Sequence, residues 1–319
     1  MNIRINYRKK NFFLMESMES VYHKLLAKVA EAGECSVFLI VSCHFLIVLY
    51  SDHRQLLRFW KELSDSEQIS LADQILNLDL PTVNKTFSEA QMKMKFEGIL
   101  ERFPDEKISS FSSDGDTWRK VGMEAIARNE VGVVLLSGGQ GTRLGSDKPK
   151  ALFDLGLPSR KSLLQIQAEK IKKLESLAGG VIPWYIMTWE STDHHIQEAL
   201  EKSKYFGLDP EQIQVFPQGN FPCLSESGDI LLQNHNTIAS SPDGNGGLFK
   251  ALKKEGVITN MEGRQLKHLF VYCVDNVLVK VADPEFLGFC ISREAECGNK
   301  VVRRRPGESV GINGLIGDS

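Results

Sequence analysis

The sequence lacks the cysteine patterns of a zinc-binding or disulfide-rich protein. Its six cysteines include no C-x-x-C pair and no spacing typical of zinc ligands. This argues against a small secreted scaffold and indicates a reducing, cytoplasmic setting. Cys273 lies in a stretch that we expect to be a buried strand, where a reduced thiol behaves as a small apolar side chain.

A strong net charge and a membrane-spanning run are also absent. The formal net charge is -3, so the composition gives no sign of nucleic-acid binding. The apolar run SVFLIVSCHFLIVLY at 36–50 is shorter than the ~20 residues that cross a bilayer, so we expect no stable membrane association. The basic segment before it either resembles an organelle-targeting leader or precedes an internal start at Met15 or Met18.

Two regions with different patterns follow each other along the chain. Residues 1–105 are mainly helical in pattern, with helices expected at 16–34 and 53–63, and Ser64 with Glu67 predicts a capping box at the start of a further helix. In residues 106–319 the expected strands lie at 131–136, 181–189, 213–218 and 269–279, with helices at 117–128, 162–177 and 247–254. This alternation predicts an α/β fold with a doubly wound, mostly parallel sheet, in which ligands bind beyond the carboxyl ends of the strands.

A glycine-rich loop follows the first expected strand of the α/β region. It reads LLSGGQGTRLGSDKPK at 135–150 and combines four glycines with three cations. Glycine lets the main chain approach a ligand closely, and the cations suit an anion such as phosphate. The loop has no G-K-[ST] triplet of a Walker A motif, and its G-x-G-x-x-x-G spacing differs from the dinucleotide fingerprint G-x-G-x-x-G. The loop therefore predicts phosphate binding of a different class.

The loop resembles the signature L-x-G-G-x-G-T-R-L-G, followed by P-K, of the UDP-sugar pyrophosphorylase family. Further stretches are similar to the UDP-N-acetylhexosamine pyrophosphorylases (also called UDP-N-acetylglucosamine diphosphorylases) within that family: GLPSRKSLLQIQAEKI, PWYIMT, KYFGL, PDGNGGLFKAL and VYCVDNVLVKVADPEFLGF. The resemblance covers roughly residues 20 to 312 apart from one interruption. It implies a Rossmann-like nucleotidyltransferase core preceded by helices.

The resemblance also implies a reaction. N-acetylglucosamine 1-phosphate and UTP would give UDP-N-acetylglucosamine and pyrophosphate, with Mg²⁺ as cofactor. The residues agree with this chemistry, because attack of a sugar phosphate on the α-phosphorus of UTP needs positioning and charge neutralisation rather than an enzyme nucleophile. N-acetylgalactosamine 1-phosphate and glucose 1-phosphate stay open as substrates.

Two cations of the loop receive catalytic roles from the resemblance. Arg143 would clamp the triphosphate and stabilise the departing pyrophosphate, and Lys150 would contact the reacting phosphates. Lys148 has less support and is expected to face solvent. The alternative is that all three are surface cations beside a flexible turn.

The nucleotide would be held by main chain and one amide. Leu136, Ser137, Gly138 and Gly139 would approach the uracil and ribose, and Ser137 stands where many relatives have alanine. The amide of Gln218 would read the uracil edge, since it offers both a donor and an acceptor. Where the family usually has another glutamine before it, this chain has a proline.

The sugar and the metal would be held by two further segments. Gly244 would pack against the base and Asn245 would hold the sugar, although a purely structural turn is the alternative for Asn245. Asp275 follows an apolar strand, where a carboxylate is costly unless it is paired or bound to metal. One carboxylate together with nucleotide phosphates suits Mg²⁺, so Asp275 is both the expected metal ligand and a substrate-binding residue.

The sequence departs from the family pattern at two places. Residues 36–52 interrupt an otherwise continuous match, and we interpret them as an insertion foreign to the fold. The chain ends where relatives continue with the rest of the sheet and a C-terminal domain, which implies a core truncated at its C-terminus with little or no turnover. A non-catalytic UTP- or UDP-sugar-binding protein is therefore the alternative function, and a dinucleotide-dependent oxidoreductase is disfavoured by the glycine spacing.

The insertion hypothesis predicts that protein from the native source lacks this segment. Translated non-coding sequence or a wrong splice choice would produce such an interruption without any demand from the fold. Peptide mapping by mass spectrometry should yield no peptide that spans residues 38–49. Recovery of such a peptide would show that the insertion is part of the native protein.

Overall fold

The computed structural model describes residues 53–92, 99–110, 114–139, 141, 145, 148–309 and 314–317. The expected helix at 16–34 and the segment 36–52 lie outside these residues. The chain divides into two compact units, which are described separately: Met1–Lys93 with Phe221–Ser241, and Met94–Asn220 with Pro242–Ser319.

The described part of the first unit is mainly helical. Its elements are η1 (Arg54–Leu57), η2 (Trp60–Glu62), α3 (Asp65–Leu76), α4 (Leu80–Gln91) and the antiparallel pair β6 (Leu232–Asn234) and β7 (Thr237–Ile238). Leucine and isoleucine side chains from the helices and from this pair form one core, with Leu56, Leu71 and Ile230 fully buried. Residues 221–241, which the sequence pattern places in the α/β region, thus pack with the N-terminal helices.

The expected capping box is confirmed, but the helix before it is not continuous. At the start of α3, the main-chain nitrogen of Ser64 donates to Glu67 Oε2 at 2.8 Å, and hydrogen bonds from Ser64 lower the pKa of Glu67. Residues 53–63, expected to be helical, form only the short turns η1 and η2. The Gln68 side chain donates to the carbonyl oxygens of Trp60 and Leu63, which are acceptors that a continuing helix would use itself.

The second unit alternates helices and strands along the chain. Its helices and helical turns are η3 (Asp105–Lys107), α5 (Gly115–Ala127), η5 (Lys150–Leu152), α6 (Leu163–Ala178), α7 (Glu190–Lys202), η6 (Lys204–Gly207), η7 (Pro210–Gln212), α8 (Gly247–Lys254), α9 (Val257–Gly263) and α10 (Pro284–Ser292). Its strands are β1 (Ile99–Arg102), β2 (Val131–Leu136), β3 (Trp184–Thr188), β4 (Ile213–Pro217), β9 (His268–Cys273) and β10 (Gly314–Gly317). Two further short strands, β5 (Asn220–Pro222) and β8 (Ser240–Pro242), pair with each other, and the boundaries between the two units fall within them.

Four of these strands form a parallel sheet in the order β4-β3-β2-β9. β2 pairs with β3 up to Leu136↔Met187 and with β9 up to Leu136↔Cys273. β3 and β4 stay paired up to Thr188↔Pro217. The chain therefore runs outward from β2 to β3 and β4, and later returns to the other side of β2 as β9. The expected parallel α/β sheet is confirmed.

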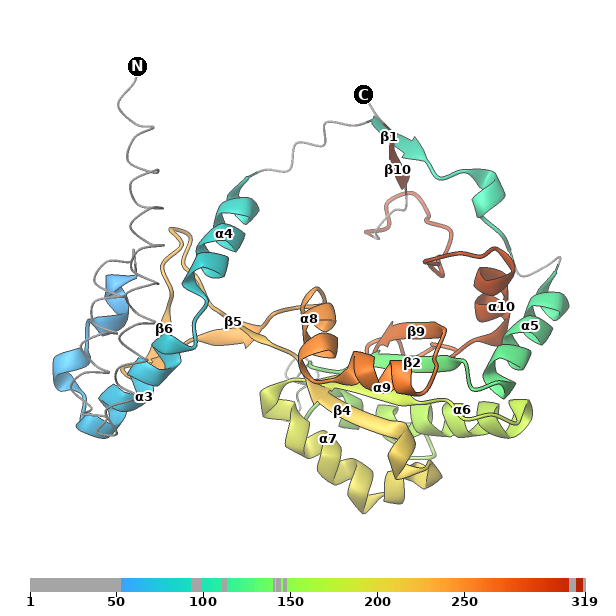
Figure 1. Cartoon of the computed structure of the whole chain (residues 1–319), viewed down its shortest axis with the longest axis horizontal. Coiled ribbons are helices and arrows are strands. Elements are labelled where there is room, and N and C mark those ends of the chain that lie inside the picture. The colour runs from blue at the N-terminus through green and yellow to red at the C-terminus, as the bar shows by residue number, and fades with distance from the viewer. Residues whose placement is uncertain are drawn as a thin grey trace. The chain divides into compact units, whose positions relative to one another are not determined.

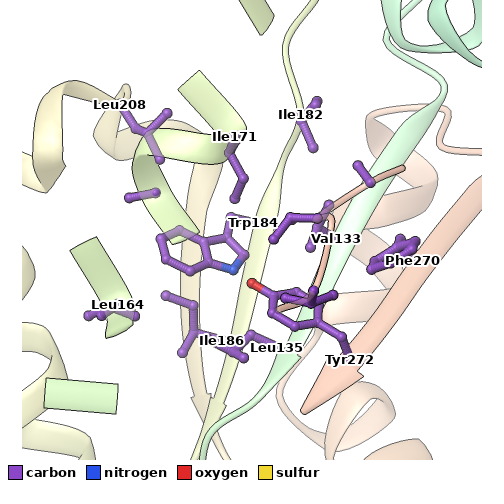
Figure 2. Close-up of a cluster of buried hydrophobic side chains, with 14 of the residues drawn as sticks. Val133, Leu135, Leu164, Ile171, Ile182, Trp184, Ile186, Leu208, Phe270 and Tyr272 are labelled. Atoms are coloured by element: carbon purple, nitrogen blue, oxygen red, sulfur yellow. The ribbon is translucent and has the colours of Figure 1, made fainter. Parts of the chain in front are cut away.

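Helices cover both faces of this sheet, with α6 and α7 on one face and α8 and α9 on the other (Figure 1). Each face of the sheet packs against its helices in a separate hydrophobic core, and alternate residues of each strand point into one core or the other. The larger core is centred on Trp184 of β3. Figure 2 shows its indole ring between Leu164 and Ile171 of α6 on one side and Tyr272 of β9 on the other.

The Glu130 carboxylate connects β2 and β9 at their amino ends. Glu130 Oε2 accepts from Arg128 Nη2 at 2.8 Å, and Glu130 Oε1 accepts from Lys267 Nζ at 2.6 Å. Its main-chain oxygen accepts from the amides of Lys267 and His268. The hydrogen bonds from Arg128 and Lys267 lower the pKa of Glu130 to about 2. The ionised side chain therefore stabilises the start of this strand pair.

The helices of the described segments do not combine the length and apolar character that a membrane span needs.

We predict that E130Q lowers the free energy of unfolding by about 1 to 2 kcal/mol near neutral pH, because a neutral acceptor replaces the charged one. The folded-state pKa lies below the ordinary 4.5, so the stabilisation is complete above that pH and is lost as the pH falls towards about 2. Urea titrations of parent and variant from pH 7 to pH 2 should therefore converge at the acid end.

The matched control is E262Q, which neutralises an exposed carboxylate on α9. It should leave the free energy of unfolding almost unchanged. A constant difference between parent and E130Q at every pH would contradict an electrostatic role for Glu130.

Candidate functional site

The residues expected to bind a ligand gather at the carboxyl ends of the parallel strands. The glycine loop follows β2, Gln218 follows β4, and Asp275 lies two residues after β9. Because β3 and β4 are added on one side of β2 and β9 is added later on the other side, the strand order reverses at β2, and a crevice is expected beyond its end. This is the place where open α/β sheets bind their ligands.

Sheet hydrogen bonds continue beyond the last strand residues and hold the start of the loop. The Ser137 amide donates to Met187 O at 2.8 Å, and the Val274 amide donates to Leu136 O at 3.0 Å. Ser137 is fully buried, and its hydroxyl has no hydrogen-bond partner within the described segments. The main-chain amide of Ser137 is therefore already used by the sheet. The expected main-chain contacts of Leu136, Ser137, Gly138 and Gly139 with a nucleotide stay a prediction.

Two side chains approach these glycines closely. A Cβ built on Gly138 would lie 2.9 Å from Gln218 Oε1, and one on Gly139 would lie 3.3 Å from Lys150 Cδ. The Lys150 amide also donates to Gly139 O at 3.2 Å, which closes the loop. The lack of a side chain at Gly138 thus leaves room for the Gln218 amide beside the main chain.

The far part of the loop is only partly described. Gly141 N donates to Lys148 O at 3.0 Å, and Gly145 has a φ of +69°, a conformation that favours glycine. Lys148 is exposed, in line with its expected place at the surface. Arg143 lies outside the described residues, so its role at the triphosphate stays a prediction.

Gln218 is largely buried beside the glycine loop. Its main-chain amide donates to Thr188 O at 2.9 Å, which extends the pairing of β3 and β4. Only 8% of the residue is exposed, and the side-chain oxygen lies close to Gly138. An amide offers both a donor and an acceptor, which suits reading the edge of a base.

Lys150 and Asp275 form an ion pair beyond the ends of β2 and β9, with Lys150 Nζ donating to Asp275 Oδ1 at 2.8 Å. The side chain of Lys150 is 23% exposed and that of Asp275 is 65% exposed. Sequence spacing gave no sign of this contact, because 125 residues separate the partners. The pair brings one cation and one carboxylate to the place where a phosphate and its metal ion would be expected.

The turn carrying Gly244 and Asn245 is attached to the segment after β4. The Asp243 amide donates to Gly219 O at 3.0 Å, and Gly219 directly follows Gln218. Gly244 has a φ of +77°, so glycine is required there for the turn as well as for any contact with a base. Both Gly244 and Asn245 are exposed and begin the approach to α8.

Comparisons with known proteins give matches over most of the chain. The family model described as UTP--glucose-1-phosphate uridylyltransferase matches residues 83–312. UDP-N-acetylglucosamine diphosphorylase 1 of Arabidopsis thaliana is 42% identical over 272 residues, which cover 79% of this chain and 53% of the relative. UDP-N-acetylglucosamine pyrophosphorylase of Saccharomyces cerevisiae is 40% identical over 279 residues, which cover 81% of this chain and 58% of the relative.

A solved structure gives the same result for the fold. The uridine diphosphate N-acetylglucosamine pyrophosphorylase of Trypanosoma brucei, in complex with an inhibitor, matches with a TM-score of 0.68 and 29% identity. The match covers 82% of this chain and 56% of that one. The chain spans about half the length of the curated relatives it matches. Over that span, the model match shows that the chain belongs to the UTP--glucose-1-phosphate uridylyltransferase family.

Proposed function

We propose that the protein is a uridylyltransferase that joins UTP and N-acetylglucosamine 1-phosphate to give UDP-N-acetylglucosamine and pyrophosphate. The observation that carries the proposal is the meeting of the Gly138–Gly139 main chain, the Gln218 amide and the Lys150–Asp275 pair at one strand-end crevice. The curated relatives named above for UDP-N-acetylglucosamine support the choice of sugar. Binding of a nucleoside triphosphate requires main-chain donors and a cation for its phosphates and a polar group that recognises its base.

The proposed reaction needs positioning rather than a protein nucleophile. The sugar-phosphate oxygen attacks the α-phosphorus of UTP, and pyrophosphate leaves in line. In this arrangement the amides of Gly138 and Gly139 approach the nucleotide, and the Lys150 ammonium neutralises charge on the reacting phosphates. Arg143, which we place at the departing pyrophosphate, remains an inference from the sequence. Asn245 would hold the sugar from the turn next to Gly244, which would pack against the uracil.

The metal part of the proposal rests on Asp275. Clusters of three or more His, Cys, Asp or Glu that could hold a metal are absent from the described segments. A single exposed carboxylate therefore fits Mg²⁺ that takes most of its other ligands from phosphate oxygens and water. When bound, Mg²⁺ would neutralise charge on the triphosphate. Asp275 would hold the metal ion in place of the Lys150 ammonium, and Lys150 would then be available to a phosphate.

The proposal also covers the fold class, the cellular location and the binding partners. We infer that the parallel sheet is part of a doubly wound, Rossmann-like nucleotidyltransferase core, because helices cover both of its faces and the strand order reverses beside β2. We place the protein in the cytoplasm, in line with cysteines that carry no disulfide among the described residues. Its partners would be the two substrates and two products, without nucleic acid.

The reaction is tested by measuring pyrophosphate release from UTP with N-acetylglucosamine 1-phosphate, N-acetylgalactosamine 1-phosphate and glucose 1-phosphate. The assay is accompanied by calorimetry of UTP binding to the same chain. We expect UTP binding, and turnover that is low but highest with N-acetylglucosamine 1-phosphate. UTP binding without product from any of the three sugar phosphates would favour a non-catalytic nucleotide-binding protein, and absence of UTP binding would overturn the proposal.

The ion pair generates a prediction about metal dependence. D275N should abolish the gain in UTP affinity that Mg²⁺ produces in the parent chain, because the carboxylate that receives the metal is lost. K150M should weaken UTP binding about tenfold with and without Mg²⁺, because a direct contact to phosphate is lost. Calorimetric titrations at fixed ionic strength measure both effects.

K148M is the matched control, since Lys148 is an exposed cation of the same loop. Its UTP affinity should stay within about twofold of the parent. Equal losses in K148M and K150M would mean that only the total charge of the loop matters.

The Gln218 amide generates a prediction about the base. Q218E replaces the amide donor with an acceptor of the same shape, so the carbonyl edge of uracil loses its partner while the amino group of cytosine gains one. We expect the preference for UTP over CTP to fall about tenfold or more. Competition binding with the two nucleotides measures this ratio, and an unchanged ratio would place the base away from Gln218.

A further inference from the structure

The carboxylate of Asp243, which has no role in the proposed reaction, lies between the two turns of the candidate site. Asp243 follows β8, and its side chain is pressed against the main chain on two sides. A Cβ built on Gly219 would lie 2.6 Å from Asp243 Oδ2, and one built on Gly247 would lie 1.9 Å from Asp243 Oδ1. Real Cβ atoms do not come this close to another heavy atom. Glycine at both positions is therefore what allows the carboxylate to occupy this place.

The carboxylate is costly where it stands. Asp243 Oδ1 is buried and has no hydrogen-bond partner in the described part of the chain. Loss of solvent raises the pKa of Asp243 above its ordinary value, and a hydrogen bond from its own main-chain amide and the charge of Lys250 oppose that rise. A desolvated acceptor without a partner, such as Oδ1, lowers stability. The folded chain therefore offsets the cost of this carboxylate only in part.

The two glycines belong to the two turns on which the proposed function depends. Gly219 directly follows Gln218, whose amide lies against Gly138. On the other side, Gly244 and Asn245 lie between Asp243 and Gly247, and the Gly247 amide donates to Gly244 O at 3.1 Å. The hydrogen bond from the Asp243 amide to Gly219 O connects the same two turns through their main chains. The side chain fills the space that remains between them.

We propose that Asp243 is a positioning residue that keeps the Gln218 turn and the Gly244–Asn245 turn at the separation needed to hold a uridine nucleotide and its sugar. The inference rests on the proposed function, since it is that function which gives the two turns a common ligand. Asp243 acts through its shape and its contacts with Gly219 and Gly247. It is not assigned a contact with the ligand.

Shape and charge are separated by comparing three substitutions. D243A removes the filling group, G247A places a methyl group where the carboxylate stands, and D243N keeps the shape without the charge. We expect D243A and G247A each to weaken UTP binding about tenfold, and D243N to stay within about threefold of the parent. In the double variant D243A/G247A the second change should cost little more, because the contact is already gone.

The readout that distinguishes positioning from ordinary structural support is the thermal midpoint. D243A removes a desolvated, unpartnered carboxylate, so its midpoint should fall by less than about 2 °C or rise, although UTP binding weakens. The control is K250A, which removes the exposed cation nearest in sequence on α8 and should change UTP affinity by less than about twofold.

Hydrogen exchange in the ligand-free full chain tests the same coupling without any nucleotide. Peptides covering 214–222 and 243–252 should both exchange faster in D243A and G247A than in the parent, and should be unchanged in K250A and D243N. This keeps the two proposals distinct. A parent that fails to bind UTP overturns the proposed function, whereas the exchange pattern still decides whether Asp243 joins the turns.

Three results would overturn the role of Asp243. One is UTP affinity in D243A within about twofold of the parent. Another is a loss in D243N as large as that in D243A, which would mean that the charge touches the ligand directly. The last is exchange at 214–222 that does not respond to D243A, because the side chain would then not hold the Gln218 turn.

Discussion

Parallel pairing of β2 with β3 on one side and β9 on the other is the constraint on which the candidate site depends. Residues that end neighbouring parallel strands are brought to one edge of the sheet, whatever their separation in sequence. The Lys150–Asp275 ion pair follows from this pairing, since the loop after β2 and the turn after β9 leave the sheet side by side. The buried side chains of β2 and β3, with Trp184 at their centre, make this edge a rigid support. A site built beyond such strand ends can hold a flexible triphosphate in one orientation.

Charge is distributed unequally between the two ends of the sheet. At the start of β2 and β9, Glu130 forms ion pairs with two cations, and these pairs stabilise the fold. At the carboxyl end, the Lys150–Asp275 pair is part exposed and is held by a single contact. Such a pair is worth little to stability. Under the proposed function its partners would therefore exchange each other for a phosphate and a metal ion at little cost, and the same two residue types would serve the fold at one end and a ligand at the other.

Glycine makes the close approaches at the site possible. Gly138 admits the Gln218 amide, and Gly219 and Gly247 admit the Asp243 carboxylate. The contacts at Gly138 and Gly219 join segments from different strand ends, so the empty space of these glycines determines how near two turns come. In contrast, the positive φ of Gly145 and Gly244 reflects the path of the main chain. The glycine-rich composition of these loops therefore has two separate physical causes.

Local sequence patterns were enough to predict most of the helices and strands and to suggest a nucleotide-binding chemistry at the strand ends. β-branched runs predicted β2 as a buried strand, Ser64 and Glu67 marked the start of α3, and the glycine spacing excluded two common nucleotide loops. These features depend on neighbours in sequence, so a local pattern reveals them. Tertiary structure alone decided that residues 53–63 stop short of a helix, that 221–241 join the N-terminal unit, and that the Ser137 amide is used by the sheet. It also decided the pairing of Lys150 with Asp275 and the place of Asp243 between two glycines, because such contacts join residues distant along the chain and depend on strand order and packing.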